Sequence, residues 1–212
     1  MSQDTPIITA AYIKRRLAGT RMPRDPLKVV FPETRPSIPQ AVREMMIADL
    51  TPAGVLIPLI ERGTSLSVLL TERSADLRHH AGQVSFPGGR MEASDANIRA
   101  TALRETHEEI GIHPRDVEVC GYLEPMATGT GYAVTPVVGF VNPAVELVLD
   151  ALEVQSAFEV PLSFLMDERN QENSHRDWRG ENVPVITFYH GQHKIWGATA
   201  GMLVALRHIL HG

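Results

Sequence analysis

A short amphipathic helix is the element that most constrains what this chain can fold into. Small or apolar residues recur at the spacing that places side chains on one face of a helix. The residues of this stripe are Ile98, Ala102, Leu103, Thr106 and Ile110. The spacing predicts a helix with a narrow buried face, capped at its start by Ser94 or Asp95.

Three glutamates belong to the same predicted helix and are expected to lie off the apolar stripe. Glu105, Glu108 and Glu109 stand at relative positions 0, 3 and 4, so their carboxylates would project from one face within about one turn. Like charges at this spacing destabilise a helix by roughly 0.2–0.5 kcal/mol per pair. A solvated acidic face is one interpretation, and a site for a hard divalent cation with oxygen ligands is the other.

A glycine-rich turn in front of the helix favours the second interpretation. Pro87, Gly88 and Gly89 end the segment SFPGG, and glycine lets a backbone approach a ligand closely. Arg73 and Arg78 lie between a predicted strand and this turn, and guanidinium groups bind phosphate oxygens in pairs. Together these residues predict a site for a phosphate compound and a cation.

The second half of this region resembles the Nudix box of the pyrophosphohydrolase superfamily. The matching residues are Gly89, Arg104, Glu105, Glu108, Glu109 and Gly111. This chain has eight residues between Asp95 and Arg104 where the general pattern has seven, which leaves the role of Asp95 open. The resemblance implies that Glu105 and Glu109, with Glu108 as a third ligand, bind Mg²⁺ or Mn²⁺. It also implies that Arg104 orients a box glutamate.

A longer signature resembles the coenzyme A pyrophosphatase branch of the superfamily. The matching residues are Leu69, Leu70, Thr71, Arg73, Arg78, Gly82, Phe86, Pro87, Gly88 and Gly89. The box of this chain is one residue longer than the general pattern, and this greater length also resembles the coenzyme A pyrophosphatase branch. The whole resemblance covers roughly residues 50–210 and implies cleavage of coenzyme A or acyl-CoA at the diphosphate, into 3′,5′-ADP and 4′-phosphopantetheine.

The resemblance further implies a set of substrate contacts. The residues concerned are Arg73, Arg78, Phe86, Gly88, Gly89 and Tyr132. The two arginines would hold phosphates, and Phe86 would pack beside an apolar or adenine face. Tyr132 is a candidate wall of the pocket, with a buried core position as an equal alternative. The group that activates water stays open among the box glutamates, Glu124 and Glu159.

Composition excludes several other classes of protein. The chain carries 20 Lys and Arg against 25 Asp and Glu, a net charge of -5, whereas a nucleic-acid-binding protein would want a basic face. A single cysteine, Cys120 in the alternating stretch VEVCGYL, excludes an internal disulfide and a cysteine-rich zinc site. No signal peptide or membrane-length apolar run is evident. We expect a cytoplasmic enzyme of a small-molecule substrate, with no membrane partner and with homodimerisation left open.

The remaining patterns predict an α/β (α+β) fold in which a mixed sheet lies between helices. Strands are expected at 54–60, 66–72, 117–123, 133–141, 185–190 and 193–197, and helices at 151–158 and 198–211. A polar loop is expected at 167–184. Phe188, Tyr189 and Trp196 are expected in the core.

The first 50 residues predict a separate region. Residues 7–18 form a candidate helix, and residues 19–42 contain five prolines and are expected to form an arm over the surface of the main domain. The predicted division is therefore an N-terminal helix and proline-rich arm at 1–50 and a Nudix hydrolase domain at 51–212.

Three alternatives to coenzyme A hydrolysis follow from the same residues. A box of this kind recognises the diphosphate and the metal rather than the groups on either side of the diphosphate. ADP-ribose, NADH or a nucleoside triphosphate could therefore be the substrate. An isomerase acting on an allylic diphosphate would use a Cys or Glu, and Cys120 in an apparent strand offers little for that. A non-catalytic binding module would be expected to lack some box glutamates, and this chain keeps all three.

Overall fold

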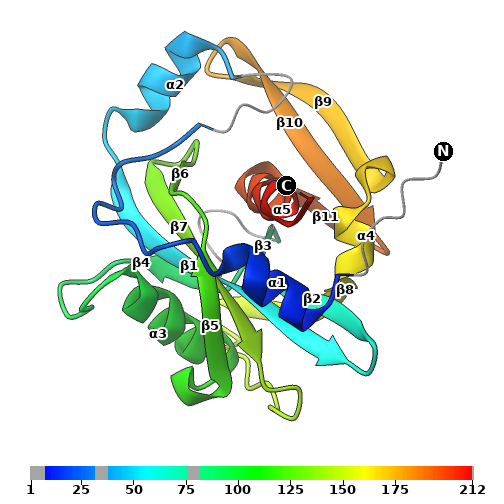
Figure 1. The fold of residues 1–212 in the computed structure, drawn as a ribbon. Coiled ribbons are helices and arrows are strands. Elements are labelled where there is room, and N and C mark those ends of the chain that lie inside the picture. Colours follow the sequence, from blue (N-terminus) through cyan, green and yellow to red (C-terminus); the bar gives the residue numbers. More distant parts are fainter. Residues whose placement is uncertain (1–7, 32–37, 76–81, 212) are drawn as a thin grey trace.

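The computed structural model describes residues 8–31, 38–75 and 82–211 of the 212-residue chain. Figure 1 shows the arrangement of its helices and strands. The helices are α1 (Ala10–Leu17), α2 (Gln40–Ile47), α3 (Ile98–Ile110), α4 (Leu162–Met166) and α5 (Gly197–His211), with 3₁₀ turns η1 (Pro114–Asp116) and η2 (Glu168–Asn170). The strands are β1 (Thr51–Arg62), β2 (Ser65–Arg73), β3 (Val84–Ser85), β4 (Gly88–Arg90), β5 (Val117–Tyr122), β6 (Met126–Ala127), β7 (Tyr132–Val141), β8 (Val154–Pro161), β9 (Gln171–Trp178), β10 (Glu181–His190) and β11 (His193–Trp196).

A mixed sheet of eight strands forms the middle of the molecule, and β1 is its central strand. β1 runs parallel to β7 from Thr51↔Tyr132 to Ile60↔Val141. On its other side β1 pairs antiparallel with β2 near its C-terminal end and with β4 over Ala53–Val55. The length of β1 therefore places the glycine-rich strand β4 beside the centre of the sheet.

The two faces of this sheet carry different layers. Leu56 and Ile60 of β1 point to the face covered by α3, whereas Ile57 and Leu59 point to a larger cluster that includes residues of α1, α4 and α5. Gly54 lets α3 approach closely, because a Cβ there would lie 2.6 Å from the carbonyl oxygen of Ile98. The predicted class, a mixed sheet between helices, is confirmed.

A second sheet, in the order β11-β10-β9, stands beside α5. Its longest feature is the β9–β10 hairpin, which reverses at Arg179 (φ 53°) and Gly180 (φ 84°). Positive φ at both central residues is typical of a type I′ turn, which matches the twist of the two strands. Most residues of β9 are exposed.

Two predictions of secondary structure are wrong. Residues 154–161 form strand β8 rather than a helix, because they pair along the length of β2 and tertiary pairing overrides local preference. The segment 167–184 contains η2, β9 and the start of β10 rather than a loop. A strand that is exposed along nearly its whole length lacks the alternation by which strands are recognised. Helix α2 was also not predicted.

The other predicted strands and the C-terminal helix are confirmed, with ends that differ by a few residues. Of the three aromatic residues expected in the core, Phe188 is fully buried. Tyr189 is 49% exposed, so its core assignment is wrong. Trp196 is half-buried and lines a cavity that is described below.

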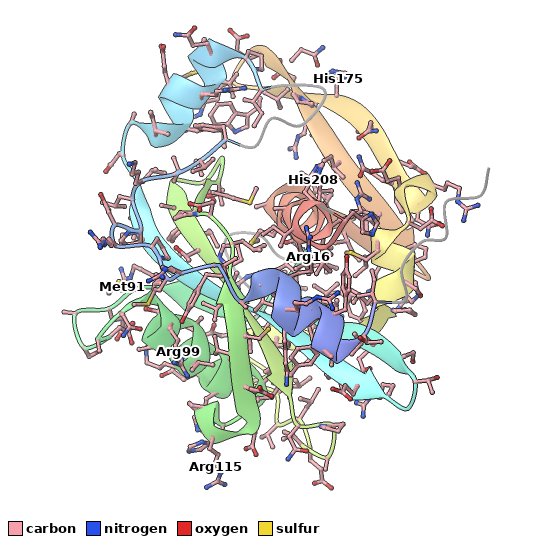
Figure 2. All side chains as sticks on the ribbon, in the orientation of Figure 1. Arg16, Met91, Arg99, Arg115, His175 and His208 are labelled. Atoms are coloured by element: carbon pink, nitrogen blue, oxygen red, sulfur yellow. The ribbon has the colours of Figure 1, made fainter. Side chains whose placement is uncertain are left out.

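The predicted N-terminal helix is confirmed as α1, and it is part of the core. Ile13 and Leu17 are fully buried against the main cluster. Lys14 Nζ forms an ion pair with Glu118 of β5 at 2.7 Å, and Arg16 Nε, which points toward α5 in Figure 2, donates to the Ile209 carbonyl at 2.7 Å. A domain boundary near residue 50 stays a prediction. In the described part of the chain, no helix combines the length and the apolar character needed to cross a membrane.

Candidate active site

Helix α3 is fixed at both ends by its own sequence. Asn97 is the N-cap and its side chain accepts a hydrogen bond from the Ala100 N–H at 3.0 Å, so the predicted capping by Ser94 or Asp95 is wrong. Gly111 ends the helix with φ 76°, and its N–H donates to the His107 carbonyl at 3.0 Å. Every residue of the predicted apolar stripe is buried.

The glycine pair of β4 lets two glutamates of α3 lie directly against the sheet. A Cβ on Gly89 would lie 2.5 Å from the carboxyl carbon of Glu105. Gly88 (φ 149°) sits against β1, where a Cβ would come within 2.4 Å of the Gly54 carbonyl oxygen, and its N–H donates to Glu109 Oε2 at 3.0 Å. Gly88 therefore requires glycine, and a side chain at Gly89 would displace the carboxylate of Glu105. Met91, labelled in Figure 2, closes β4 by donating its N–H to the Pro52 carbonyl at 2.9 Å.

Glu109 is the most unusual side chain of the cluster, because it is a buried carboxylate with 3% exposure. Arg73 approaches it with Nη1 at 3.5 Å from Oε1, and Gly88 donates to its other oxygen. Burial raises the pKa of Glu109 to about 7, against the lowering effects of Gly88 and Arg73. Glu153 and Glu105 raise it further through charge repulsion. The prediction that all three box glutamates lie off the buried face is wrong for Glu109.

Glu153 is a residue of this site that the sequence did not reveal. Its negative charge acts on both Glu105 and Glu109, raising the pKa of each. The turn that carries it is anchored to the end of α3, where the Asp150 N–H donates to the Glu109 carbonyl at 2.9 Å. It is anchored equally to the end of β2, where Ser74 N–H donates to the Glu153 carbonyl at 2.9 Å. The sequence gives no sign that the turn carrying Glu153 lies beside the box glutamates, because its anchoring contacts come from segments that are distant along the chain.

Arg104 holds the outer part of the cluster together. Its guanidinium binds Asp95 through two bonds of 2.9 Å, and its Nη1 reaches Glu105 Oε1 at 3.0 Å and Glu108 Oε2 at 2.8 Å. The Arg104 guanidinium lowers the pKa of Asp95 to about 2. Asp95 is thus an ion-pair partner of Arg104, which gives the open box position a structural role. Glu105 has a raised pKa, because burial outweighs the opposing effect of Arg104.

The three box glutamates do not share one environment. The Glu108 side chain is 56% exposed, that of Glu105 is 16% exposed and Glu109 is buried. Among the described residues, no three His, Cys, Asp or Glu side chains gather closely enough to form a ready-made metal site. The predicted single face of three converging carboxylates is therefore wrong as stated, because Arg104 binds two of the glutamates and β4 binds the third.

The chemistry of Glu105 and Glu109 nevertheless fits a hard divalent cation. Both offer oxygen ligands, and both have a pKa raised by burial and by neighbouring negative charge. A group in this situation gains from a cation beside it, because the cation favours the charged form. Burial is the main cause of both raised pKa values, with repulsion from neighbouring carboxylates as a smaller one, and a bound cation would oppose both effects.

Several other predicted site residues have different positions. Phe86 is 2% exposed and belongs to the core, so the prediction that it packs beside the substrate is wrong. Tyr132 is 38% exposed at the start of β7, which excludes the alternative of a buried core tyrosine. Arg78 lies outside the described residues.

Glu159 and Glu124 are the two predicted candidates outside the box for the group that activates water, and they have different surroundings. Glu159 is bound by Arg62 at 2.6 Å, which commits it to an ion pair on β8 and makes it a wrong candidate for the water-activating group. Glu124 is exposed in the segment after β5. Burial raises the pKa of the Cys120 thiol to about 11, which disfavours the reactive thiolate.

Comparison with known proteins places these features in a family. The family model described as NUDIX domain matches residues 50–187. "Uncharacterized Nudix hydrolase NudL" of Citrobacter koseri is 44% identical over 151 residues, which cover 71% of this chain and 78% of that protein. The protein of the same name from Escherichia coli SMS-3-5 is 41% identical over 165 residues, covering 78% of this chain and 84% of the relative.

Solved structures give weaker matches. A Nudix hydrolase from Alicyclobacillus acidocaldarius aligns with a TM-score of 0.49 and 17% identity over 76% of this chain and 92% of its own. The Nudix domain of Shewanella oneidensis NrtR, described as a complex with ADP ribose, aligns with a TM-score of 0.43 and 19% identity over 55% of this chain and 76% of its own.

Proposed function

Because the chain belongs to the Nudix family of hydrolases, we propose that it cleaves the diphosphate of coenzyme A or acyl-CoA with the help of Mg²⁺ or Mn²⁺. The products would be 3′,5′-ADP and 4′-phosphopantetheine or its acyl form. The observation that carries the proposal is the contact of Glu105 and Glu109 with the glycine strand β4, with Arg73 beside them. This arrangement puts anionic ligands, backbone N–H groups and a guanidinium at one point.

Glu105 and Glu109 would hold the divalent cation, and Glu108 is the third candidate ligand. When bound, such a cation neutralises charge on the diphosphate oxygens and lowers the pKa of a bound water. A magnesium ion is typically bound through one or two carboxylates together with waters and substrate phosphates. Two buried or half-buried carboxylates with raised pKa values therefore agree with this need.

The chain's own residues would bind and orient the reactants. Arg73 would bind a phosphate oxygen, since its side chain is 26% exposed and its guanidinium lies beside the carboxylate of Glu109. Arg104 would orient Glu105, which it binds at 3.0 Å. Attack by water forms a new P–O bond, breaks the bridging P–O bond and releases a proton. Glu153 would accept this proton, because its charge acts on both Glu105 and Glu109 and it is not assigned to the cation.

The choice of coenzyme A rests on the sequence signature between Leu69 and Gly89. Within it, Leu70 and Phe86 are buried and support the strands on which the glycines sit. Arg73 is the described polar residue of the signature that reaches Glu109. These positions support a role of the signature in shaping the site. The identity of the substrate is tested by measuring which compound is cleaved.

A substrate panel tests the proposal. Purified protein with Mg²⁺ is incubated separately with coenzyme A, ADP-ribose, NADH and a nucleoside triphosphate, and the products are identified by mass. We expect 3′,5′-ADP and 4′-phosphopantetheine from coenzyme A at the highest kcat/KM. Faster cleavage of another compound would replace coenzyme A as the substrate, and no cleavage of any compound would favour a binding module. The cytoplasmic location and homodimerisation remain predictions to be tested separately.

A further inference from the structure

A cavity of about 250 Å³ lies on the face of the large sheet opposite α3. It is enclosed by α2, β6, the β9–β10 hairpin and the start of α5, which surround one region in Figure 1. Most of the side chains that line it are apolar. Representative residues are Val42 and Met46 of α2, Met126 of β6, Val185 of β10 and Ala198 of α5. Its volume lies just below the roughly 300–1,000 Å³ range of small-molecule pockets, as suits a part of a ligand rather than a whole one.

We propose that this cavity receives the acyl chain of an acyl-CoA whose diphosphate is bound at β4. The inference rests on the proposed function and adds a specificity determinant to it. The residues involved come from the N-terminal segment, β6 and its turn, the hairpin, and the end of β11 with the start of α5, and none of these carries the box or the upstream signature. The preference for an acyl chain would therefore be set outside those two motifs.

Four neighbouring strands connect β4, against which Glu105 and Glu109 lie, with β6, which lines the cavity. Gly89 of β4 pairs with Gly54 of β1, Gly54 pairs with Thr135 of β7, and the adjacent Val134 pairs with Met126 of β6. At about 4.8 Å per strand, β4 and β6 are separated by roughly 14 Å. The pantetheine arm has about as many backbone bonds as four extended residues, which span roughly 13–14 Å. Its length matches the separation.

The turn between β6 and β7 lies on the path between the two sites. Thr128 and Gly129 line the cavity, and Thr128 exchanges hydrogen bonds with Tyr132, from Thr128 N–H to the Tyr132 carbonyl at 2.8 Å and from Tyr132 N–H to Thr128 Oγ1 at 3.1 Å. Tyr132 begins the strand that pairs with β1 and is 38% exposed. It is therefore placed to contact the arm of a substrate that runs from β4 to the cavity.

The lining favours an alkyl chain over the adenine ring at the other end of coenzyme A. Each tryptophan of the cavity already has a guanidinium over its ring, with Arg176 5.1 Å from the Trp196 centroid and Arg179 4.8 Å from that of Trp178. An adenine also carries polar edges that need partners when buried. An alkyl chain needs only apolar volume, and methionine side chains such as Met46 and Met126 adapt to chains of varying shape.

Intrinsic fluorescence provides a direct binding test, because both tryptophans of the chain, Trp178 and Trp196, line this cavity. The protein is titrated in EDTA, which prevents turnover, with octanoyl-CoA, coenzyme A and 3′,5′-ADP in parallel. We expect octanoyl-CoA to change the emission and the other two compounds to change it much less. An equal change with 3′,5′-ADP would make adenine the occupant, and no change with octanoyl-CoA would also overturn the inference.

Two variants test the same cavity during turnover. Val185→Phe reduces the volume and should lower the ratio of kcat/KM for octanoyl-CoA to that for coenzyme A by about tenfold. Met46→Ala enlarges the cavity and should shift the preference toward longer acyl chains, which keeps the test valid if Val185→Phe does not fold. The matched control is Met45→Ala, since Met45 is a neighbouring exposed residue of α2 outside the cavity lining.

The outcomes separate the inference from the proposed function. If coenzyme A is cleaved but the fluorescence and the chain-length ratios do not respond, the acyl site is wrong and the hydrolase activity stands. If no coenzyme A compound is cleaved but octanoyl-CoA changes the fluorescence, the cavity binds the acyl group and the proposed reaction is wrong. If neither response is seen, both are overturned.

Discussion

The two ends of helix α3 treat negative charge in opposite ways. Near its start, Asp95 is bound by two hydrogen bonds from Arg104, and its pKa is lowered to about 2. Near its end, Glu109 is buried beside a more distant arginine, and its pKa is raised to about 7. The first pair is compensated and holds the chain in place. The second carboxylate is disfavoured in its ionised form by burial, and a bound cation would favour that form.

The largest expected effect comes from Glu109→Gln, which removes the buried carboxylate proposed as a metal ligand. We expect kcat for coenzyme A to fall by at least 100-fold, on the scale of about 10²–10⁴ for a lost catalytic carboxylate. The metal-free protein should keep its stability, because burial already disfavours the ionised form of Glu109. Steady-state kinetics and thermal unfolding in EDTA measure the two effects. Near-normal turnover at saturating Mg²⁺ would remove Glu109 from the site.

Asp95→Asn tests the compensated end, and we expect it to act on stability. The unfolding free energy at pH 7 should fall by about 1–2 kcal/mol, because the pKa of Asp95 is lowered from 3.8 to about 2 in the folded state. A lowered pKa stabilises the fold above about pH 4, and this contribution is lost as the pH falls toward 2. Urea unfolding of both proteins at pH 7 and pH 2.5 should therefore show a difference that shrinks in acid. Equal stability at pH 7 would contradict the assignment.

Glu153→Gln tests whether the carboxylate of Glu153, which lies outside the box, takes part in the reaction. We expect about a tenfold loss of kcat, since the residue is separate from the box yet lies close enough to raise the pKa of Glu105 and Glu109. Glu146→Gln is the matched control, because Glu146 is an exposed glutamate of the segment between β7 and β8. If both variants have the same kinetics, Glu153 has no part in the reaction.

Arg73→Ala removes the guanidinium that faces Glu109. We expect KM for coenzyme A to rise about five- to tenfold with a smaller change in kcat, as for a group that binds a phosphate in both ground and transition states. Arg99→Ala is the control, since Arg99 is exposed on α3 and is labelled in Figure 2. An unchanged KM for Arg73→Ala would count against phosphate binding.

The smallest effect is expected from Glu108→Gln. Glu108 is the most exposed box glutamate, and it forms an ion pair with Arg104, four residues earlier. Loss of this exposed pair should change stability by less than about 0.5 kcal/mol, and we expect kcat to change by less than about threefold. Parallel kinetics with Glu109→Gln decide the point. A loss as large as that of Glu109→Gln would make Glu108 a full metal ligand and would remove the contrast between the glutamates.

Local patterns predicted much of this protein because they report contacts close in sequence. The stripe on α3 is buried as expected, the strands around β1 are confirmed, and two of the box glutamates, Glu105 and Glu109, lie at β4. Local patterns failed for β8 and for β9, whose strand character comes from pairing with distant segments. The core position of Phe86 likewise depends on which face of the sheet it meets.

The sequence by itself determined the helix, the glycine pair and the acidic spacing, because each follows from the geometry of one short segment. Only the tertiary structure decided how the charges are shared. In the folded protein Asp95 forms an ion pair with Arg104, and Glu109 is buried. Glu153, from a turn distant in sequence, lies near Glu109, and an apolar cavity forms between α2 and the hairpin. Burial and charge repulsion depend on what surrounds a group in space, and residues far apart in the chain supply those surroundings.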